Sequence, residues 1–412
     1  MNWKKKFVRN WGRLGMKCKL SDICVFRKGK VDVSKLTLKT YISTENMLPN
    51  KGGVTEASSL PTVQLTQEYK KGDILVSNIR PYFKKIWQAK CDGGCSNDVL
   101  VFQGNSNIDG DFLYYILAND DFFAYSMATS KGTKMPRGDK TSIMQYEVPI
   151  FDIDTQRKIA SVLRSLDEKI ELNSTINNNL EQQAQAIFKE WFIDNPENNE
   201  WSTGTFSELI KSTLNGDWGK EAPTGNNTEK VYCIRGADIP EVKAGNKGKM
   251  PTRYILPKNF AAKQLAAGDI VVEISGGSPT QSTGRCTAIT QSLLDRYDSG
   301  MVCTNFCKAM KPKEGYSLFI YYYWQYLYGK GVFFSYENGT TGIKNLDFSG
   351  FIETETILIP PVDKIIAFDD YCKSIFNQIF ANGKQNEHLA VLRDTLSPKL
   401  MSGELDVSDI DL

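Results

Sequence analysis

Two long stretches of the chain carry apolar residues at alternating spacings of three and four. The first runs from Ile159 to Trp191, and the second runs from Phe368 to Leu400. This spacing places one apolar stripe along a helix and, when sustained over many turns, is typical of a coiled coil. At a rise of 1.5 Å per residue, each predicted helix is about 50 Å long. Asp154, just before the first stripe, is a plausible N-terminal cap.

Asparagine interrupts both stripes at the same two heptad positions. An Asn in an apolar seam costs stability, but an Asn opposite it fixes the register of two helices. We therefore predict that the two helices pair, and that replacing Asn173 and Asn177 by Leu raises thermal stability while loosening register. The alternative is that the Asn173–Asn179 tract and Asn382-Gly383 mark breaks or fraying. The predicted seam residues are Leu163, Leu166, Ile170, Asn173, Asn177, Leu180, Ile375, Ile379, Asn382, Asn386, Leu389 and Leu396.

The remaining sequence also occurs in two copies. Gly72-Asp-Ile-Leu-Val recurs as Gly268-Asp-Ile-Val-Val, and Cys95-Ser-Asn recurs as Cys303-Thr-Asn. Short β-branched runs bounded by Gly, Asn and Asp predict strands in both copies. We predict an α+β fold of two mixed α/β domains separated and joined by the two long helices. The predicted boundaries are an N-terminal extension at 1–16, domains at 17–152 and 201–362, and long helices at 153–200 and 363–412, the latter with a C-terminal tail.

Charge follows the same division. The net charge of +2 conceals a basic block at residues 1–152, with 23 Lys and Arg against 15 Asp and Glu, and a weakly basic block at 201–362, with 17 against 15. Each helical block has 5 against 9. Such asymmetry indicates different partners for different parts of the chain. The apolar run from Leu318 to Tyr328 is too short to cross a bilayer, so we expect a buried helix there and no membrane segment.

The sequence offers little catalytic chemistry. It contains one histidine, His388, inside the second predicted helix, which argues against Ser-His-Asp or Cys-His catalysis. No GxxxxGK[ST] phosphate loop, dinucleotide-binding turn or Asn-Pro-Pro-aromatic methylation motif occurs. The nine Cys are expected to be reduced thiols in a cytoplasmic protein; zinc at Cys91/Cys95 and Cys303/Cys307 is the less favoured alternative. We therefore predict a binding protein without metal or cofactor.

Polar and cationic segments follow corresponding strands in both copies and are candidates for DNA contact. Arg and Asn side chains suit guanine and adenine edges, and Lys neutralises phosphate. Ordinary solvated surface is the alternative for each segment. The candidates in the first domain are Asn78, Arg80, Tyr82, Lys84, Lys85, Lys131, Thr133, Lys134, Arg137 and Lys140. Those in the second domain are Ser278, Thr280, Gln281, Arg285, Thr340, Thr341, Lys344 and Asn345.

The chain resembles the specificity subunit of type I restriction–modification systems. The resemblance lies in residues 72–85 (GDILVSNIRPYFKK), 131–150 (KGTKMPRGDKTSIMQYEVPI) and 152–173 (DIDTQRKIASVLRSLDEKIELN). The approach to the first helix, with Gln156-Arg157 before Ile159-Ala160, is the most specific of these patterns. The second copy departs there, because Pro361-Val-Asp-Lys-Ile-Ile-Ala lacks the Gln.

The resemblance implies two target-recognition domains, each reading one half of a split site in double-stranded DNA. It implies an antiparallel coiled coil that sets the gap and docks modification subunits, which carry the methylation chemistry. It also implies restriction subunits, which carry ATP-driven cleavage. A fused methyltransferase–nuclease should contain cofactor and catalytic motifs, and a non-catalytic coiled-coil adaptor should lack equivalent cationic loops in both copies.

Overall fold

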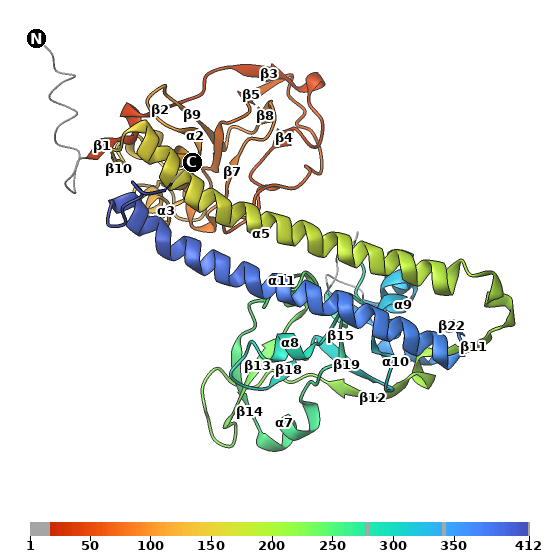
Figure 1. The fold of residues 1–412 in the computed structure, drawn as a ribbon. Helices are drawn as coiled ribbons and strands as arrows, with labels where there is room; N and C mark the ends of the chain where they lie inside the picture. The colour runs from red at the N-terminus through yellow and green to blue at the C-terminus, as the bar shows by residue number, and fades with distance from the viewer. Residues whose placement is uncertain (1–16, 277, 279–280, 340–342, 411–412) are drawn as a thin grey trace, which may run out of the picture. The chain divides into compact units, whose positions relative to one another are not determined.

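A computed structural model describes residues 17–276, 278, 281–339 and 343–410. The predicted N-terminal extension at 1–16 lies outside these residues. The chain divides into two compact units (Figure 1). The first unit comprises residues 1–168 and 390–412, and the second comprises residues 169–389. Each unit therefore contains part of both long helices.

The two helices form where the heptad pattern predicts them. Helix α5 spans Ile153–Phe188 and continues into one π-helical turn at Lys189–Ile193, and helix α11 spans Val362–Ser402. The cap differs from the prediction: the carboxylate of Asp152, not Asp154, accepts a hydrogen bond from the Thr155 backbone N–H at 2.9 Å. The α5 pattern also includes Gln156, whose side-chain oxygen accepts from the Asp109 backbone N–H at 2.8 Å.

The second copy secures its helix differently. Asp369 of α11 is buried and accepts a hydrogen bond from the Leu318 backbone N–H at 2.7 Å. Leu318 lies in the first turn of a helix that follows β19, just as Asp109 caps the helix that follows β9. Asp369 of α11 thus bonds the start of α9, as Gln156 of α5 bonds the start of α2. Asp369 lies one helical turn further from the start of its helix than Gln156 does. This carboxylate accounts for the absence of the Gln in the second copy.

Helices α5 and α11 pair antiparallel, which confirms the predicted coiled coil (Figure 1). In the second unit the Asn173 amide donates to Asn386 Oδ1 at 2.9 Å, and the Asn382 amide donates to Asn177 Oδ1 at 2.8 Å. All four Asn side chains are buried. In the first unit, Arg393 of α11 forms an ion pair with Asp167 of α5 at 2.6 Å.

The Asn residues of the two stripes do not break the helices, and Asn177 also contacts a residue outside them. Helix α11 runs without interruption through Asn382 and Gly383. A Cβ at Gly383 would lie 1.8 Å from the carbonyl oxygen of Gly245, so the glycine permits a close approach of this loop to the helix. The Asn177 amide also donates to the Ala244 carbonyl at 3.1 Å. The expected gain in stability from Leu at position 177 therefore does not follow from this structure.

The first unit contains two four-stranded sheets and a two-stranded ribbon. The sheets have the orders β2-β9-β6-β7 and β3-β5-β8-β4, and the ribbon pairs β1 with β10 just before α5. The strands are β1 (Lys17–Lys19), β2 (Cys24–Phe26), β3 (Lys30–Asp32), β4 (Tyr41–Ile42), β5 (Leu65–Tyr69), β6 (Ile74–Ser77), β7 (Ile86–Gln88), β8 (Gly93–Cys95), β9 (Val99–Gly104) and β10 (Glu147–Pro149). The helices are α2 (Gly110–Ala118), α3 (Asp120–Ala128) and α4 (Lys140–Ile143), with 3-10 turns at Leu20–Asp22, Val33–Lys35 and Pro81–Phe83.

The second unit repeats part of this plan. Its sheets have the orders β12-β19-β15-β17, β14-β13-β18 and β16-β21-β20, and a β11–β22 ribbon precedes α11. The strands are β11 (Ser202–Thr205), β12 (Ile210–Asn215), β13 (Glu229–Ile234), β14 (Thr252–Ile255), β15 (Ile270–Glu273), β16 (Ser275–Gly276), β17 (Cys286–Ala288), β18 (Met301–Cys303), β19 (Cys307–Pro312), β20 (Glu337–Asn338), β21 (Lys344–Leu346) and β22 (Thr356–Ile359). The helices are α6 (Ile239–Lys243), α7 (Pro257–Lys263), α8 (Gln291–Leu294), α9 (Ser317–Gly329) and α10 (Phe348–Thr354), with 3-10 turns at Pro196–Glu200, Phe206–Glu208, Gly236–Asp238 and Val332–Tyr336.

Duplication is visible in the strand order. The sheets β2-β9-β6-β7 and β12-β19-β15-β17 correspond strand for strand, and the recurring Gly-Asp-Ile stretches open β6 and β15. A parallel pair accompanies each sheet: β4 with β8, and β13 with β18. The repeated sequence patterns therefore reflect a repeated structural unit.

Each unit has its own core, and the long helices contribute to both cores. In the second unit Phe188 of α5 and Phe368 of α11 pack with aromatic residues of α9, which is the predicted buried helix. In the first unit Leu163 of α5 and Leu400 of α11 are buried with β6, β9 and α2. Each core therefore includes residues of both long helices.

Candidate nucleic-acid interface

In the first unit, the two predicted cationic segments form one surface. The loop after β6 and the loop between α3 and α4 are far apart in sequence, but their backbones are hydrogen bonded. The Arg80 N–H donates to the Pro136 carbonyl at 2.8 Å, and the Gly138 N–H donates to the Asn78 carbonyl at 3.2 Å. We call this surface, residues 78–85 with 131–140, the first loop pair.

Ion pairs hold several of its cations. Lys84 contacts Asp120 at 2.7 Å, Lys131 contacts Asp139 at 2.6 Å, and Arg137 contacts Asp98 at 3.1 Å. The hydrogen bond from Lys131, together with those from Ser142, lowers the pKa of Asp139 to about 2. Thr133, Lys134 and Lys140 are exposed. The exposed cations are available to a polyanion.

The loop after β6 has an unusual backbone. Arg80 and Lys84 flank the Pro81–Phe83 turn and both have φ of 50°, a left-handed conformation that is costly for residues with a Cβ. The turn exposes the rings of Tyr82 and Phe83, whose centroids are 4.7 Å apart. Asn78, by contrast, is only 8% exposed. The turn thus exposes two aromatic rings between partly exposed cations, whereas Asn78 is buried.

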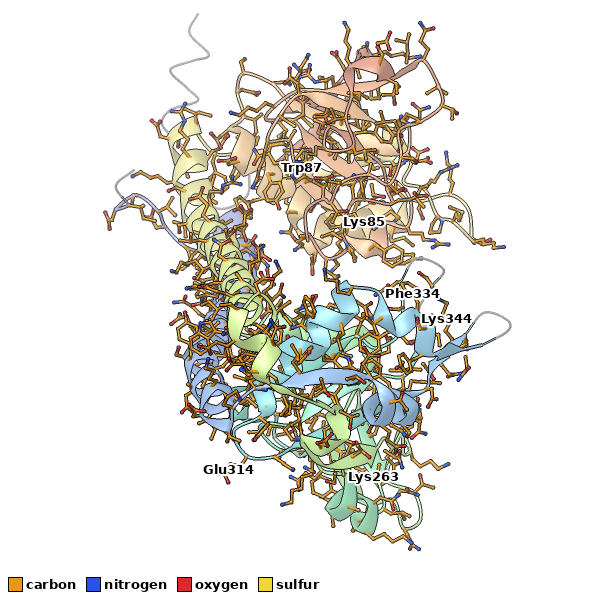
Figure 2. The ribbon with its side chains drawn as sticks, turned by 90° about the vertical axis from the view of Figure 1, so that its right-hand side faces the viewer. Lys85, Trp87, Lys263, Glu314, Phe334 and Lys344 are labelled. Carbon is orange, nitrogen blue, oxygen red and sulfur yellow. The ribbon has the colours of Figure 1, made fainter. Side chains whose placement is uncertain are left out.

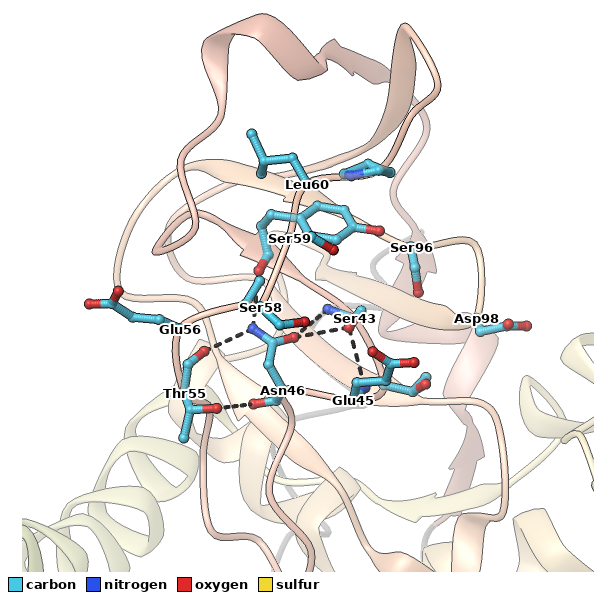
Figure 3. A pocket seen from close by; sticks show the side chains of 14 residues that line it. Ser43, Glu45, Asn46, Thr55, Glu56, Ser58, Ser59, Leu60, Ser96 and Asp98 are labelled. Atoms are coloured by element: carbon cyan, nitrogen blue, oxygen red, sulfur yellow. Dashed lines mark hydrogen bonds between the residues drawn. The ribbon is translucent and has the colours of Figure 1, made fainter. Parts of the chain in front are cut away.

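A polar pocket of about 390 Å³ adjoins this surface (Figure 3). Its lining includes Ser43, Glu45, Ser96 and Asp98. Asn46 holds the wall of the pocket, because its amide donates to the carbonyls of Tyr41 and Thr55, and its oxygen accepts from Ser43. Lys85 turns toward the same wall and donates to the Thr44 carbonyl at 2.6 Å. Burial lowers the pKa of the Lys85 ammonium.

In the second unit, the corresponding segments also meet. Strand β16 follows β15 and pairs with β21 in the register Ser275↔Asn345 and Gly276↔Lys344. The side chains of Ser275 and Asn345 are hydrogen bonded. We call the described residues of 275–285 and 337–346 the second loop pair. Thr280, Thr340 and Thr341 lie outside the described residues, and Ser278 and Gln281 are joined through their backbones.

Charged side chains of the second loop pair are strongly engaged. Arg285 forms a bidentate pair with the buried Glu273 at 2.8 and 2.7 Å, and these bonds raise the pKa of its guanidinium. Lys344 contacts Glu337 at 2.7 Å and lies 4.9 Å from the ring centroid of Phe334 (Figure 2). The guanidinium of Arg285 is therefore held by a buried carboxylate, whereas the ammonium of Lys344 lies beside an exposed aromatic ring.

Backbone hydrogen bonds identify a further pair of equivalent positions, Asp98 and Phe306. Asn78 N–H donates to the Asp98 carbonyl at 2.8 Å, and Ile274 N–H donates to the Phe306 carbonyl at 2.9 Å. Each residue lies between equivalent strands, β8 and β9 or β18 and β19. The sequence prediction missed both residues, although the repeated Cys-Ser-Asn and Cys-Thr-Asn motifs end immediately before them.

Other candidate groups lie apart from these surfaces. Cys91 is exposed, whereas Cys95, Cys303 and Cys307 are buried, and burial raises the pKa of Cys95 and Cys307 to about 12. Within the described residues, no three His, Cys, Asp or Glu side chains are grouped as metal binding requires. His388 lies on an exposed face of α11. No helix in the described part of the chain is both long and apolar enough to span a bilayer.

Comparison with known proteins agrees with the architecture. Residues 15–182 match the family described as the type I restriction modification DNA specificity domain. The specificity subunit of type I restriction enzyme HindI from Haemophilus influenzae is 34% identical over 42% of this chain and 40% of its own length. The specificity subunit of type I restriction enzyme MjaIX from Methanocaldococcus jannaschii is 28% identical over 76% of this chain and 74% of its own length.

A solved structure supports the fold assignment. The S subunit of a type I restriction–modification system from M. genitalium superposes with a TM-score of 0.56, at 16% identity, over 96% of this chain and 98% of that one. The likeness shows a shared fold. The family match thus covers residues 15–182 of this chain, and the shared fold extends over nearly its whole length.

Proposed function

We propose that this chain is the DNA-reading subunit of a cytoplasmic type I restriction–modification complex and is itself non-catalytic. Residues 17–152 and 201–362 are the two target-recognition domains. Each domain reads one half of a bipartite site in double-stranded DNA. Modification subunits supply methylation, and restriction subunits supply cleavage.

The observation that carries this proposal is the paired arrangement of the loop segments. In both units, two segments distant in sequence converge beside equivalent strands, β6 and β15. The first loop pair combines exposed cations with exposed aromatic rings. The second contains Lys344 and Asn345, and the exposed ring of Phe334 lies beside Lys344. Cations bind phosphate, and amide, guanidinium and apolar groups read base edges. Equivalent frameworks with unlike side chains suit two different half-sites.

The long helices supply the rest of the function. We assign to α5 and α11 the roles of setting the gap between half-sites and docking the modification subunits. Their antiparallel pairing is fixed by buried Asn–Asn hydrogen bonds, which oppose slippage of one helix along the other. A fixed register is what a molecular ruler requires. A flexible connection between the domains would tolerate half-sites at many spacings.

Domain exchange tests this proposal. Residues 17–152 are replaced by the corresponding domain of another specificity subunit, and the complex with modification subunits is assayed on duplexes that vary one half-site at a time. We expect the exchange to change the preferred sequence of one half-site only and to leave the gap unchanged. A change in both half-sites, or equal binding to all duplexes, would contradict the proposal. A coiled-coil adaptor would give the second result.

A further inference from the structure

Phe306 is an exposed aromatic residue that the fold of the second unit does not require. Its side chain is 62% exposed, although it lies between two fully buried strand ends, Cys303 and Cys307. Exposing a large apolar side chain forgoes part of the stabilisation that burial would give. A single exposed apolar side chain is ordinary on a protein surface. The location of Phe306 makes it informative.

Phe306 lies directly against the second loop pair. Its carbonyl oxygen accepts hydrogen bonds from the backbone N–H groups of Ile274 and Ser275, at 2.9 and 3.2 Å. Ser275 in turn is in register with Asn345. Two other exposed apolar side chains flank β20 and β21: Phe334, which is 45% exposed, and Ile343, which is 60% exposed. The second loop pair therefore has an apolar component in addition to Lys344 and Asn345.

The equivalent position of the first unit has the opposite chemistry. Three backbone N–H to carbonyl hydrogen bonds of the first unit recur at equivalent positions of the second. In the first unit they run from Ser96 to Ile42, from Val99 to Ser96 and from Asn78 to Asp98. In the second unit they run from Thr304 to Ile234, from Cys307 to Thr304 and from Ile274 to Phe306. Residue 98 is an Asp that forms an ion pair with Arg137, and residue 306 is a Phe. The framework is thus kept while the exposed side chain changes from an anion to an aromatic ring.

We infer that Phe306 is a specificity-determining residue of the second recognition domain and contacts the C5-methyl group of a thymine in its half-site. This inference rests on the proposed function. Apolar side chains, Phe among them, read thymine in the major groove through this methyl group, which is the only apolar group on the base edges exposed there. An apolar residue cannot neutralise phosphate, so its contribution is to sequence preference and not to the salt-dependent affinity.

The test combines protein variants with altered DNA. The full chain, in complex with modification subunits, is titrated with a duplex carrying its recognition sequence, and each thymine of the second half-site is replaced in turn by deoxyuridine. For the wild-type protein we expect one replacement to weaken binding by about four-fold, the effect of losing one buried methyl group. Phe306→Ala should weaken binding to the thymine duplex and be insensitive to that replacement.

Two controls separate the methyl contact from other effects. Phe306→Leu keeps an apolar side chain and should retain part of the sensitivity to deoxyuridine, whereas Phe306→Asp should abolish it. Replacing thymines in the first half-site should affect the wild type and Phe306→Ala equally. The slope of log affinity against log salt should be the same for the wild type, Phe306→Ala and Phe306→Leu, because none of these changes alters the charge of the protein.

The outcomes distinguish failure of this inference from failure of the proposed function. If the wild-type complex binds an unrelated duplex of the same length as tightly as the duplex carrying its recognition sequence, the proposed function is wrong. If it prefers its site but Phe306→Ala responds to deoxyuridine as the wild type does, only the inference is wrong. A third outcome is that the wild type does not respond to loss of the methyl group and Phe306→Ala binds every duplex equally weakly. This would indicate that the ring inserts between bases without reading the methyl group, and it would also overturn the inference. A second half-site without thymine on either strand would overturn it as well.

Discussion

Replacing Asn177 by Leu should destabilise the second unit, although it makes the coiled-coil seam more apolar. Asn177 is 4% exposed and makes three hydrogen bonds through its side chain. Its amide donates to the carbonyls of Ile379 and Ala244, at 3.0 and 3.1 Å, and its oxygen accepts from the Asn382 amide at 2.8 Å. Leu can make none of these bonds. The Ala244 carbonyl and the Asn382 amide would lose these partners in a region where water has little access.

The magnitude follows from these two groups. Each buried polar group left without a partner costs about 1–3 kcal/mol, whereas the added apolar burial of Leu returns about 1–2 kcal/mol. We therefore expect a net loss of about 2 kcal/mol. For a unit of this size that corresponds to a fall in the melting temperature of about 4–8 °C. Calorimetry and native-state hydrogen exchange at the amides of α5 and α11 would measure the loss.

Two further variants make this prediction specific. Asn178→Leu places the same substitution on an exposed face of α5 and should change stability by no more than about 0.5 kcal/mol. In the double variant Asn177→Leu/Asn382→Leu, the Asn382 amide that Asn177→Leu leaves without its partner is also removed. The double variant should therefore lose less free energy of unfolding than the sum of the two single variants. A rise in melting temperature for Asn177→Leu, or strict additivity of the pair, would refute the assigned hydrogen-bond network.

Three other predictions test separate parts of the structure. Lys134→Ala should reduce the salt slope of DNA binding by about one if this exposed Lys contacts phosphate, and an unchanged slope would exclude it from the contact. Gly383→Ala should destabilise the second unit by about 1–3 kcal/mol in chemical denaturation, because its Cβ would meet the Gly245 carbonyl. Gly329→Ala, where nothing lies within 4 Å of the added Cβ, serves as its control. Iodoacetamide at pH 8 should alkylate Cys91 first, as followed by mass spectrometry, because Cys91 is exposed. Burial raises the pKa of thiols such as Cys307 to about 12, so they stay protonated and react slowly. Labelling of all cysteines at the same rate would contradict this burial.

Much of the fold could be predicted because its largest elements have strong periodic patterns. The heptad stripes predicted both long helices, and the matching Asn positions predicted that the helices pair. The repeated Gly-Asp-Ile stretches indicated duplicated sheets. The cap was assigned to Asp154 and not to Asp152 because the two carboxylates lie two residues apart at the start of the helix, and only the backbone geometry shows that Asp152 precedes the helix while Asp154 lies in its first turn.

The candidate site was less accessible from sequence. The cationic segments could be recognised by composition, but not the ion pairs that engage Lys84, Arg137 and Arg285 with distant carboxylates. Phe306 lacks any local signal of exposure, since it stands in an apolar strand-like stretch where an inward-facing side chain is expected. The Ala244 contact of Asn177 likewise joins residues far apart in sequence. Such contacts depend on tertiary packing and not on local pattern.

Under the proposed function, two unlike domains joined by the paired long helices read a bipartite site. The most direct measurement is single-molecule sequencing of DNA methylation in cells that carry this chain with its modification subunits. We expect one asymmetric motif made of two unlike specific blocks separated by a non-specific gap of fixed length. A variant with four residues inserted after Glu181 lengthens α5 by about 6 Å and should methylate the same two blocks at a longer gap or not at all. A continuous or palindromic motif would contradict recognition of a bipartite site by two unlike domains. An unchanged gap in an active insertion variant would show that the long helices do not set the gap.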